Sequence, residues 1–178
     1  MIKKILLVIV ALVVVLAVVI QFQPSSFNVT RTGVIGAPPE KVFGLVNDFH
    51  NWEKWSPWIH LDPAAKMTFS GSPSGNGAVY SWAGNDQVGE GRMTITSSEP
   101  YSRIAIQLEF IKPFASTAVN DFRFTPKDGA TEVTWTMSGE NNFLSKAFCL
   151  FMGGMDKMIG PDFEKGLALM KTAAEGSD

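Results

Sequence analysis

The feature that most constrains the fold is a two-residue alternation of apolar and polar side chains, which begins at Lys66 and continues to Met137. Turn signals such as Asn76-Gly77 divide it into six short stretches. Strands joined by short turns can pair only antiparallel, because parallel neighbours need long crossover connections. We therefore predict a sheet of six consecutive antiparallel strands, covered on one side only. The strands are expected near residues 66–70, 78–83, 88–97, 104–110, 118–124 and 133–137.

A long amphipathic helix is predicted at the C-terminal end, from Met155 to Glu175. Its apolar residues recur at spacings of three and four and form one wide stripe. Such a stripe must lie against apolar surface, and the apolar face of the sheet is the only candidate upstream. Gly160-Pro161 is expected to kink this helix or to mark a restart. A further apolar run, Phe143–Met152, is expected to lead from the last strand into it.

One more strand and a short helix are predicted before the alternating region. Phe27–Ile35 has the pattern of a strand, and the segment 36–39 breaks it. Proline at a first helical turn favours a short amphipathic helix from there to Phe49. This helix leads into 51–58, which contains three tryptophans. The order of strand, short helices, strands and long helix predicts the α+β class, with both helical segments on the apolar face.

The N-terminus differs in character from the rest of the chain. After Lys3 and Lys4, an uninterrupted apolar run extends from Ile5 to Ile20. A cleaved signal peptide and an uncleaved signal anchor are the two interpretations. The following residues offer no small side chains at the spacing of a cleavage site, so we favour a single-pass transmembrane anchor. The positive-inside rule then keeps the N-terminus in the cytoplasm and places the domain on the periplasmic or extracytoplasmic side.

The sequence therefore divides into four parts. We expect the anchor at 1–23, a linker at 24–26, one folded domain at 27–175 and a tail at 176–178. A domain of this length is large enough to bury a substantial core.

Charge and cysteine content exclude several classes of function. The chain has 15 Lys and Arg residues and 17 Asp and Glu residues. Without Lys3 and Lys4, 13 basic residues face 17 acidic ones, a net charge of about −4, which disfavours nucleic-acid binding. The single cysteine, Cys149, excludes an intrachain disulfide, and the two histidines lack partners at metal-ligand spacing. We expect no metal site and no cofactor.

The strand alternation assigns the strand carboxylates to the polar face. Glu90, Glu109, Asp121 and Glu132 alternate with the apolar residues of their own strands, and arginines share their face. We expect cross-strand ion pairs there, each worth less than about 1 kcal/mol, rather than catalytic acids.

Few polar groups share the apolar face. Tyr80 and Asn120 do, and His60 is a further candidate. Tyr80 and Asn120 are either satisfied core groups or the polar contacts that orient a ligand in an apolar cavity. Tyr80 and His60 are weak candidates for catalysis, since no carboxylate partner can be assigned to the histidine from the sequence.

The order of elements, together with Ala37–Phe43 (APPEKVF) and Trp52–Trp58 (WEKWSPW), resembles the START-like, or SRPBCC, superfamily. Within it, the chain is most similar to members described as polyketide cyclase or dehydrase-like. The resemblance covers residues 27–175 and implies the helix-grip fold. In this fold, a curved seven-stranded antiparallel sheet wraps around the C-terminal helix and leaves a cavity between them. The superfamily includes lipid carriers, hormone receptors, ring-cyclising enzymes and cochaperone modules, so the resemblance implies fold more than function.

The tryptophans give the strongest indication of a ligand. The chain contains five, and this large, stiff side chain is suited to lining a pocket for planar or acyl groups. A large core wrapped by bulky residues is the alternative explanation. The alternation within the strands and the apolar stripe of the C-terminal helix predict which residues surround the cavity. These are Trp55, Trp58, Tyr80, Trp82, Met93, Leu108, Phe110, Asn120, Phe122, Trp135, Met155, Ile159 and Phe163.

Three functions remain open at this point. The leading hypothesis is a membrane-anchored binding domain for an apolar or amphipathic small molecule, lipid-like or polycyclic. The second is a cyclase- or dehydratase-type enzyme that acts on a ligand in the same cavity. The third is a protein-interaction module whose interior is simply packed. The sequence identifies neither the ligand nor the oligomeric state.

Overall fold

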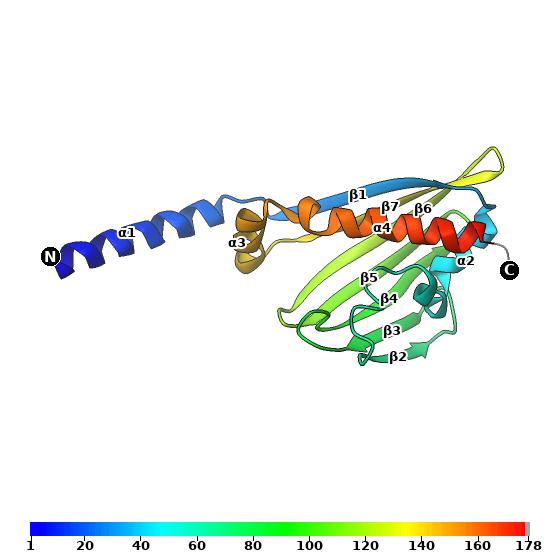
Figure 1. Ribbon diagram of the computed structural model, residues 1–178, viewed down its shortest axis with the longest axis horizontal. Helices are drawn as coiled ribbons and strands as arrows, with labels where there is room; N and C mark the ends of the chain where they lie inside the picture. The colour runs from blue at the N-terminus through cyan, green and yellow to red at the C-terminus, as the bar shows by residue number, and fades with distance from the viewer. Residues whose placement is uncertain (177–178) are drawn as a thin grey trace.

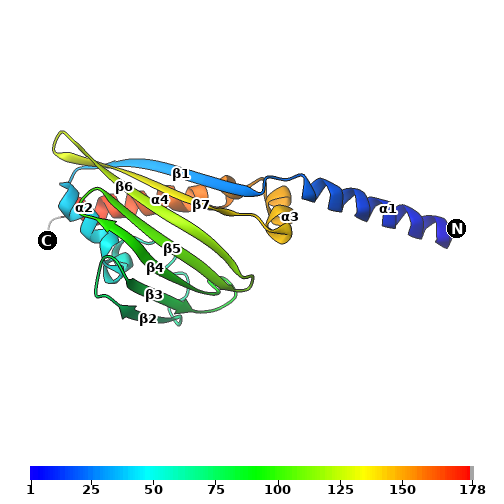
Figure 2. The same ribbon diagram turned by 180° about the vertical axis from the view of Figure 1, so that it is seen from behind.

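The computed structural model describes residues 1–176. The strands are β1 (Ser26–Ile35), β2 (Lys66–Gly71), β3 (Ala78–Ala83), β4 (Glu90–Glu99), β5 (Arg103–Lys112), β6 (Ser116–Lys127) and β7 (Ala130–Glu140). The helices are α1 (Ile2–Gln21), α2 (Pro39–Asn47), the 3-10 helix η1 (Phe49–Lys54), α3 (Phe143–Met152) and α4 (Met155–Glu175). The α+β class and the helix-grip fold are confirmed: one curved antiparallel sheet wraps around α4 (Figures 1 and 2).

The sheet has the strand order β1-β7-β6-β5-β4-β3-β2. Strands β2 to β7 form the predicted meander, and β1 extends the sheet by pairing with β7, so that Ser26 is opposite Glu140. Strand β4 begins at Glu90, later than the predicted start at Val88. The reason is Gly89, whose φ of 63° places it in the turn between β3 and β4 rather than in the strand.

The two faces of the sheet have the predicted characters. Ile104, Ile106 and Phe122 on the inner face have no exposed surface. On the outer face, Arg92 and Glu109 form a cross-strand ion pair at 2.7 Å. The other predicted outer carboxylates are paired in the same way: Glu90 with Lys112, Asp121 with Arg103 and Arg123, and Glu132 with Lys127.

Helix α4 runs without a break from Met155 to Glu175, with Pro161 inside it. The restart expected at Gly160-Pro161 is therefore wrong. Gly160 instead makes room for Arg31 of β1, whose guanidinium would collide with any Cβ at that position. The same guanidinium pairs with Asp156 and Glu164 of α4, each at 2.7 Å, and so joins the first strand to the last helix.

Two apolar helices lie at the end of the molecule opposite the C-terminus (Figure 1). Helix α1 has the length and composition to cross a membrane, and Ile20 is its only buried residue. Helix α3 is capped by the Asn142 side chain, which accepts a hydrogen bond from the backbone N–H of Ser145 at 2.8 Å. The β1 strand starts one residue earlier than predicted, at Ser26. Of the predicted tail, 176–178, only Gly176 lies within the described residues.

Candidate functional site

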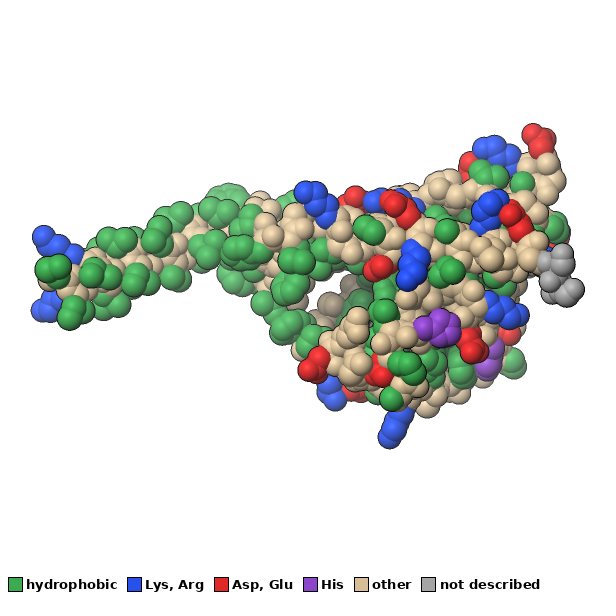
Figure 3. Space-filling model, viewed as in Figure 1, with side chains coloured by type: hydrophobic (Ala, Val, Ile, Leu, Met, Phe, Trp, Pro, Cys, Tyr) green, Lys and Arg blue, Asp and Glu red, His purple; other side chains and the backbone are tan. Residues whose placement is uncertain are grey.

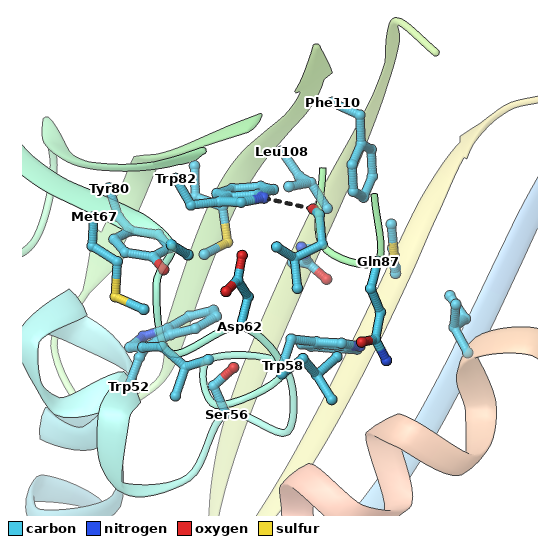
Figure 4. A pocket seen from close by; sticks show the side chains of 18 of the residues that line it. Trp52, Ser56, Trp58, Asp62, Met67, Tyr80, Trp82, Gln87, Leu108 and Phe110 are labelled. Atoms are coloured by element: carbon cyan, nitrogen blue, oxygen red, sulfur yellow. Dashed lines mark hydrogen bonds between the residues drawn. The ribbon is translucent and has the colours of Figure 1, made fainter. Parts of the chain in front are cut away.

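A cavity of about 480 Å³ lies between the inner face of the sheet, the loops around 55–65 and 84–89, and the first three turns of α4. Figure 3 shows the molecule hollowed beneath the start of α4, with hydrophobic side chains at the margin. In Figure 4, Tyr80, Trp82 and Leu108 form one wall of the cavity, and Trp52 and Trp58 face them. Most of its lining is therefore aromatic or aliphatic.

The tryptophan segment is held in place by its indole N–H groups. Trp52 Nε1 donates to the carbonyl of Val46 at 3.0 Å, and Trp55 Nε1 donates to the carbonyl of Leu45 at 2.8 Å. Both acceptors are carbonyls in the last turn of α2, which lack partners inside the helix. Trp58 Nε1 donates to Asp162 Oδ2 of α4 at 3.2 Å. These bonds fix the segment between α2 and α4 as one wall of the cavity.

A second wall is built by Trp82, whose ring packs against β4 at Gly91. Its Nε1 donates to the carbonyl of Val88 at 3.0 Å, and its ring stacks on Tyr80 with centroids 5.8 Å apart (Figure 4). Gly91 makes this arrangement possible, because a Cβ there would collide with the Trp82 ring and lie 2.7 Å from the backbone oxygen of Glu109.

An aromatic stack closes the cavity where α4 meets the sheet. The rings of Trp135 and Phe163 are nearly parallel, with centroids 3.9 Å apart. Trp135 Nε1 donates to Asn120 Oδ1 at 3.0 Å. Phe122 stacks on Trp135 at 4.9 Å and lies in the core, fully buried.

Three buried polar side chains that line the cavity each have a group without a protein partner. Within residues 1–176, the Tyr80 hydroxyl, the Asn120 Nδ2 group and the Ser56 hydroxyl make no side-chain hydrogen bond to the protein. All three residues are buried. Burial raises the pKa of Tyr80 above its usual value, because the phenolate would lose its hydration. The cavity therefore offers a neutral phenol, an amide donor and a hydroxyl to a bound molecule.

Asp62 is the one carboxylate at the cavity, and the sequence analysis did not identify it. Its Oδ1 accepts a hydrogen bond from the backbone N–H of Ala64 at 3.0 Å, and its Oδ2 accepts one from Asn85 at 2.8 Å. Asp62 thus ties the 55–65 loop to the turn after β3 and closes that end of the cavity. Since both oxygens accept backbone hydrogen bonds, a structural role accounts for its burial.

Comparison with protein families identifies the family to which this chain belongs. The family model described as "Polyketide cyclase / dehydrase and lipid transport" matches residues 26–175. The chain belongs to this family. A search of the curated proteins found no match.

Solved structures share the fold of this polyketide cyclase/dehydrase family member at low identity. A protein from Chromobacterium violaceum is 14% identical with a TM-score of 0.57, and the match covers 86% of this chain and all of that one. The Aha1 dimer from Colwellia psychrerythraea is 17% identical (TM-score 0.57; 85% and 99% covered). Ara h 8.0201 is 8% identical (TM-score 0.59; 85% and 99% covered). At these identities the likeness concerns the fold alone.

The structure of this family member brings most of the predicted cavity residues together. The lining includes Trp58, Tyr80, Trp82, Met93, Leu108, Phe110, Asn120, Trp135, Ile159 and Phe163. Three predicted residues lie elsewhere: Trp55 and Phe122 are buried in the core, and Met155 lies one turn before Met158, which lines the cavity instead. His60 is also outside the cavity; its side chain is exposed and its Nε2 lies 3.0 Å from the backbone oxygen of Glu53.

Several lining residues were not predicted. They are Trp52, Ser56, Ile59, Leu61, Asp62, Ala65, Met67, Gln87, Val88, Met137 and Met158. Met137 lies on the inner face of the sheet, and Met158 lies on the apolar stripe of α4. The alternation and the helical spacing that predicted their neighbours therefore apply to them as well. Most of the others belong to loops, where no periodicity indicates which side chain turns inward.

Proposed function

We propose that this chain is a membrane-anchored binding domain that holds one apolar or amphipathic small molecule in the cavity. The observation that carries the proposal is the cavity itself, about 480 Å³ and lined mainly by apolar side chains. Ligand pockets typically measure about 300–1,000 Å³ and combine apolar walls with a few polar groups. The family description, which includes lipid transport, supports the same class of ligand.

The distribution of polar groups favours an amphipathic ligand over a plain hydrocarbon. The Tyr80 hydroxyl, the Asn120 amide and the Ser56 hydroxyl face a mainly apolar space. A ligand with a carbonyl, ester or hydroxyl group can accept hydrogen bonds from these groups, each worth about 0.5–1.5 kcal/mol. Its aliphatic or polycyclic part would then contact the tryptophans.

Membrane attachment is proposed through α1. The helix has 20 residues, close to the number that spans a bilayer. Lys3 and Lys4 at its start favour a cytoplasmic N-terminus, which places the folded domain on the periplasmic or extracytoplasmic side. Residues 22–25 connect α1 to β1, and the folded domain that follows carries the cavity.

An enzyme of cyclase or dehydratase type is the second candidate, and the Tyr80 hydroxyl favours it. A neutral phenol in an apolar cavity can donate a hydrogen bond to a carbonyl and stabilise charge that develops on its oxygen. The phenol of Tyr80 is protonated at neutral pH, since the ordinary pKa of tyrosine is about 10 and burial raises the pKa of Tyr80 further. The exposed position of His60 favours Tyr80 over the histidine as the reacting group.

Mass spectrometry of bound molecules tests the proposal. The full chain and its Ile159→Trp variant are purified into lipid nanodiscs in the same way, and the organic extracts are compared. Ile159 lines the cavity from α4, so the larger side chain should occupy the ligand space. We expect a molecule that is retained by the wild type and missing from the variant. Identical extracts from both proteins, with no compound in stoichiometric amount, would favour an interaction module with an unoccupied interior.

A further inference from the structure

Helix α3 is apolar and only partly covered within the described chain. None of its ten residues is buried. Its large side chains are exposed: Phe143, Leu144, Phe148, Phe151 and Met152, with Phe151 exposed by 71%. Lys146 is its only charged residue. A folded domain in water rarely exposes so many large apolar side chains on one short helix, and such patches mark surfaces that contact a partner or a membrane.

The position of α3 beside α1 follows from the sheet. Ser26 at the start of β1 pairs with Glu140 at the end of β7, so the chain enters from α1 and leaves toward α3 at the same end of two neighbouring strands. Asn141 Nδ2 donates to the carbonyl of Pro24 at 3.1 Å, and Lys146 Nζ donates to the carbonyl of Gln21 at 3.2 Å. These contacts join the start of α3 to the end of α1.

The connection from α1 to the sheet is short. Only residues 22–25 separate the two elements, a length that reaches at most about 14 Å when fully extended. The end of the domain that carries α3 must therefore stay close to the point where α1 leaves a bilayer. Phe22, exposed by 84%, lies within this connection.

The β5–β6 turn adds apolar side chains at the same end. Ala118 near the start of β6 pairs with Gly139 near the end of β7, which places this turn beside the point where α3 begins. Ile111 and Phe114 in or next to the turn are exposed by 50% and 55%. Figure 3 shows hydrophobic side chains continuing from α1 over this end of the domain.

We infer that α3 lies in the interfacial region of the bilayer that α1 crosses, and that it holds the cavity entrance against the lipid. The inference rests on the proposed anchoring by α1. Its partner is a lipid surface, because the apolar surface of α3 is continuous with that of α1 and is joined to it by the contacts of Asn141 and Lys146. In interfacial helices, Phe and Leu are among the side chains that enter the boundary between headgroups and acyl chains.

The entrance of the cavity faces this lipid-contacting end. Met158 and Ile159, which line the cavity, lie one to two turns after α3 ends. Phe110, also in the lining, precedes the β5–β6 turn. Figure 3 shows the hollow directly beneath this junction. A molecule can thus move between the bilayer and the cavity past α3 without crossing bulk water.

Site-specific labelling tests where α3 lies. The full chain with Cys149→Ser, which removes the native thiol, receives a single cysteine by Phe151→Cys on α3 or, as control, by Asp128→Cys in the β6–β7 turn at the opposite end. Each variant carries a nitroxide and is reconstituted into phosphatidylcholine vesicles. Collision with oxygen, which concentrates in lipid, is compared with collision with a water-soluble nickel chelate.

We expect the label at 151 to favour oxygen and the label at 128 to favour the nickel chelate. If the protein floats with the vesicles but both labels favour the chelate equally, α3 lies in water and this inference is wrong while the anchor stands. If the protein does not float with vesicles, the anchor fails and the inference fails with it. The two failures are therefore distinguishable.

A transfer measurement tests the role of α3 in ligand entry. In the full chain, Phe148→Ser with Phe151→Ser removes two aromatic groups from α3, and Val34→Ser, an exposed position on β1, is the control. Transfer of a fluorescent fatty acid from vesicles to the cavity should slow by about tenfold in the α3 variant only, because two phenylalanines no longer enter the lipid. Equal transfer rates in all three proteins would show that ligand enters by another route.

Discussion

The close packing around Gly91 in the cavity wall predicts that Gly91→Ala destabilises the protein. A Cβ at this position would collide with the Trp82 ring and lie 2.7 Å from the backbone oxygen of Glu109. The β5 backbone cannot withdraw without breaking its pairing, so Gly91→Ala must displace the tryptophan. Overpacking of this kind costs about 1–3 kcal/mol, and the lost hydrogen bond from Trp82 to Val88 adds about 1 kcal/mol.

We therefore expect Gly91→Ala to lower the free energy of unfolding by about 2–4 kcal/mol. For a chain of this size, that corresponds to a decrease in Tm of roughly 5–15 °C. Gly44→Ala is the matched control, because Gly44 lies inside α2 and a Cβ there meets no atom within 4 Å. The control should gain about 0.5–1 kcal/mol from reduced backbone entropy.

The assay is thermal unfolding of the full chain in one detergent, followed by the near-ultraviolet circular dichroism of the tryptophans. The displaced Trp82 ring should also enter the cavity and weaken ligand binding. If both alanine variants are equally stable, the Trp82 ring does not pack against Gly91 and the described cavity wall is incorrect.

Three further predictions concern the outer face, the aromatic stack and Tyr80. Glu109→Gln should change the free energy of unfolding by less than about 1 kcal/mol and leave ligand binding intact, since its ion pair is exposed; thermal unfolding and a binding titration check this. Trp135→Phe should destabilise by about 1–3 kcal/mol, because Asn120 Oδ1 loses its donor; combining it with Asn120→Leu should recover part of the loss in the same unfolding assay. In a Tyr101→Phe chain, Tyr80 is the only tyrosine. Its absorbance titration should give a pKa above the ordinary value of about 10. Since the folded state then holds the phenolic proton more tightly than the unfolded state, the free energy of unfolding should fall as the pH rises above about 10.

The strands and the long helix could be predicted because each is periodic. Alternation along the strands predicts which side chains lie on the inner face of the sheet, and spacings of three and four predict the apolar stripe of α4. Leu108 and Ile159, predicted in this way, both line the cavity. The family resemblance implied that a seventh strand joins the sheet. The pairing of β1 with β7 was not predicted, because alternation alone does not say which strand an isolated strand joins.

The loops account for most of what the sequence did not predict. Trp52, Trp55 and Trp58 lie in a 3-10 helix and the coil after it, where no period assigns a face, and only the hydrogen bonds to α2 and α4 decide which of them line the cavity. Asp62 was missed for the same reason. The exposure of α3 was also not predicted, since an apolar run has the same sequence pattern in a buried helix and in one that contacts lipid.

Direct titration of the cavity tests the central claim. The full chain in nanodiscs is titrated with a fluorescent fatty acid, and binding is followed by energy transfer from the tryptophans, several of which line the cavity. We expect saturation at one molecule per chain in the wild type and loss of that saturable signal in Ile159→Trp, with the Tm of the variant close to that of the wild type. A signal that rises without saturation and is the same in both proteins would contradict the account, because it would mean that the probe dissolves in the lipid and that the cavity binds nothing.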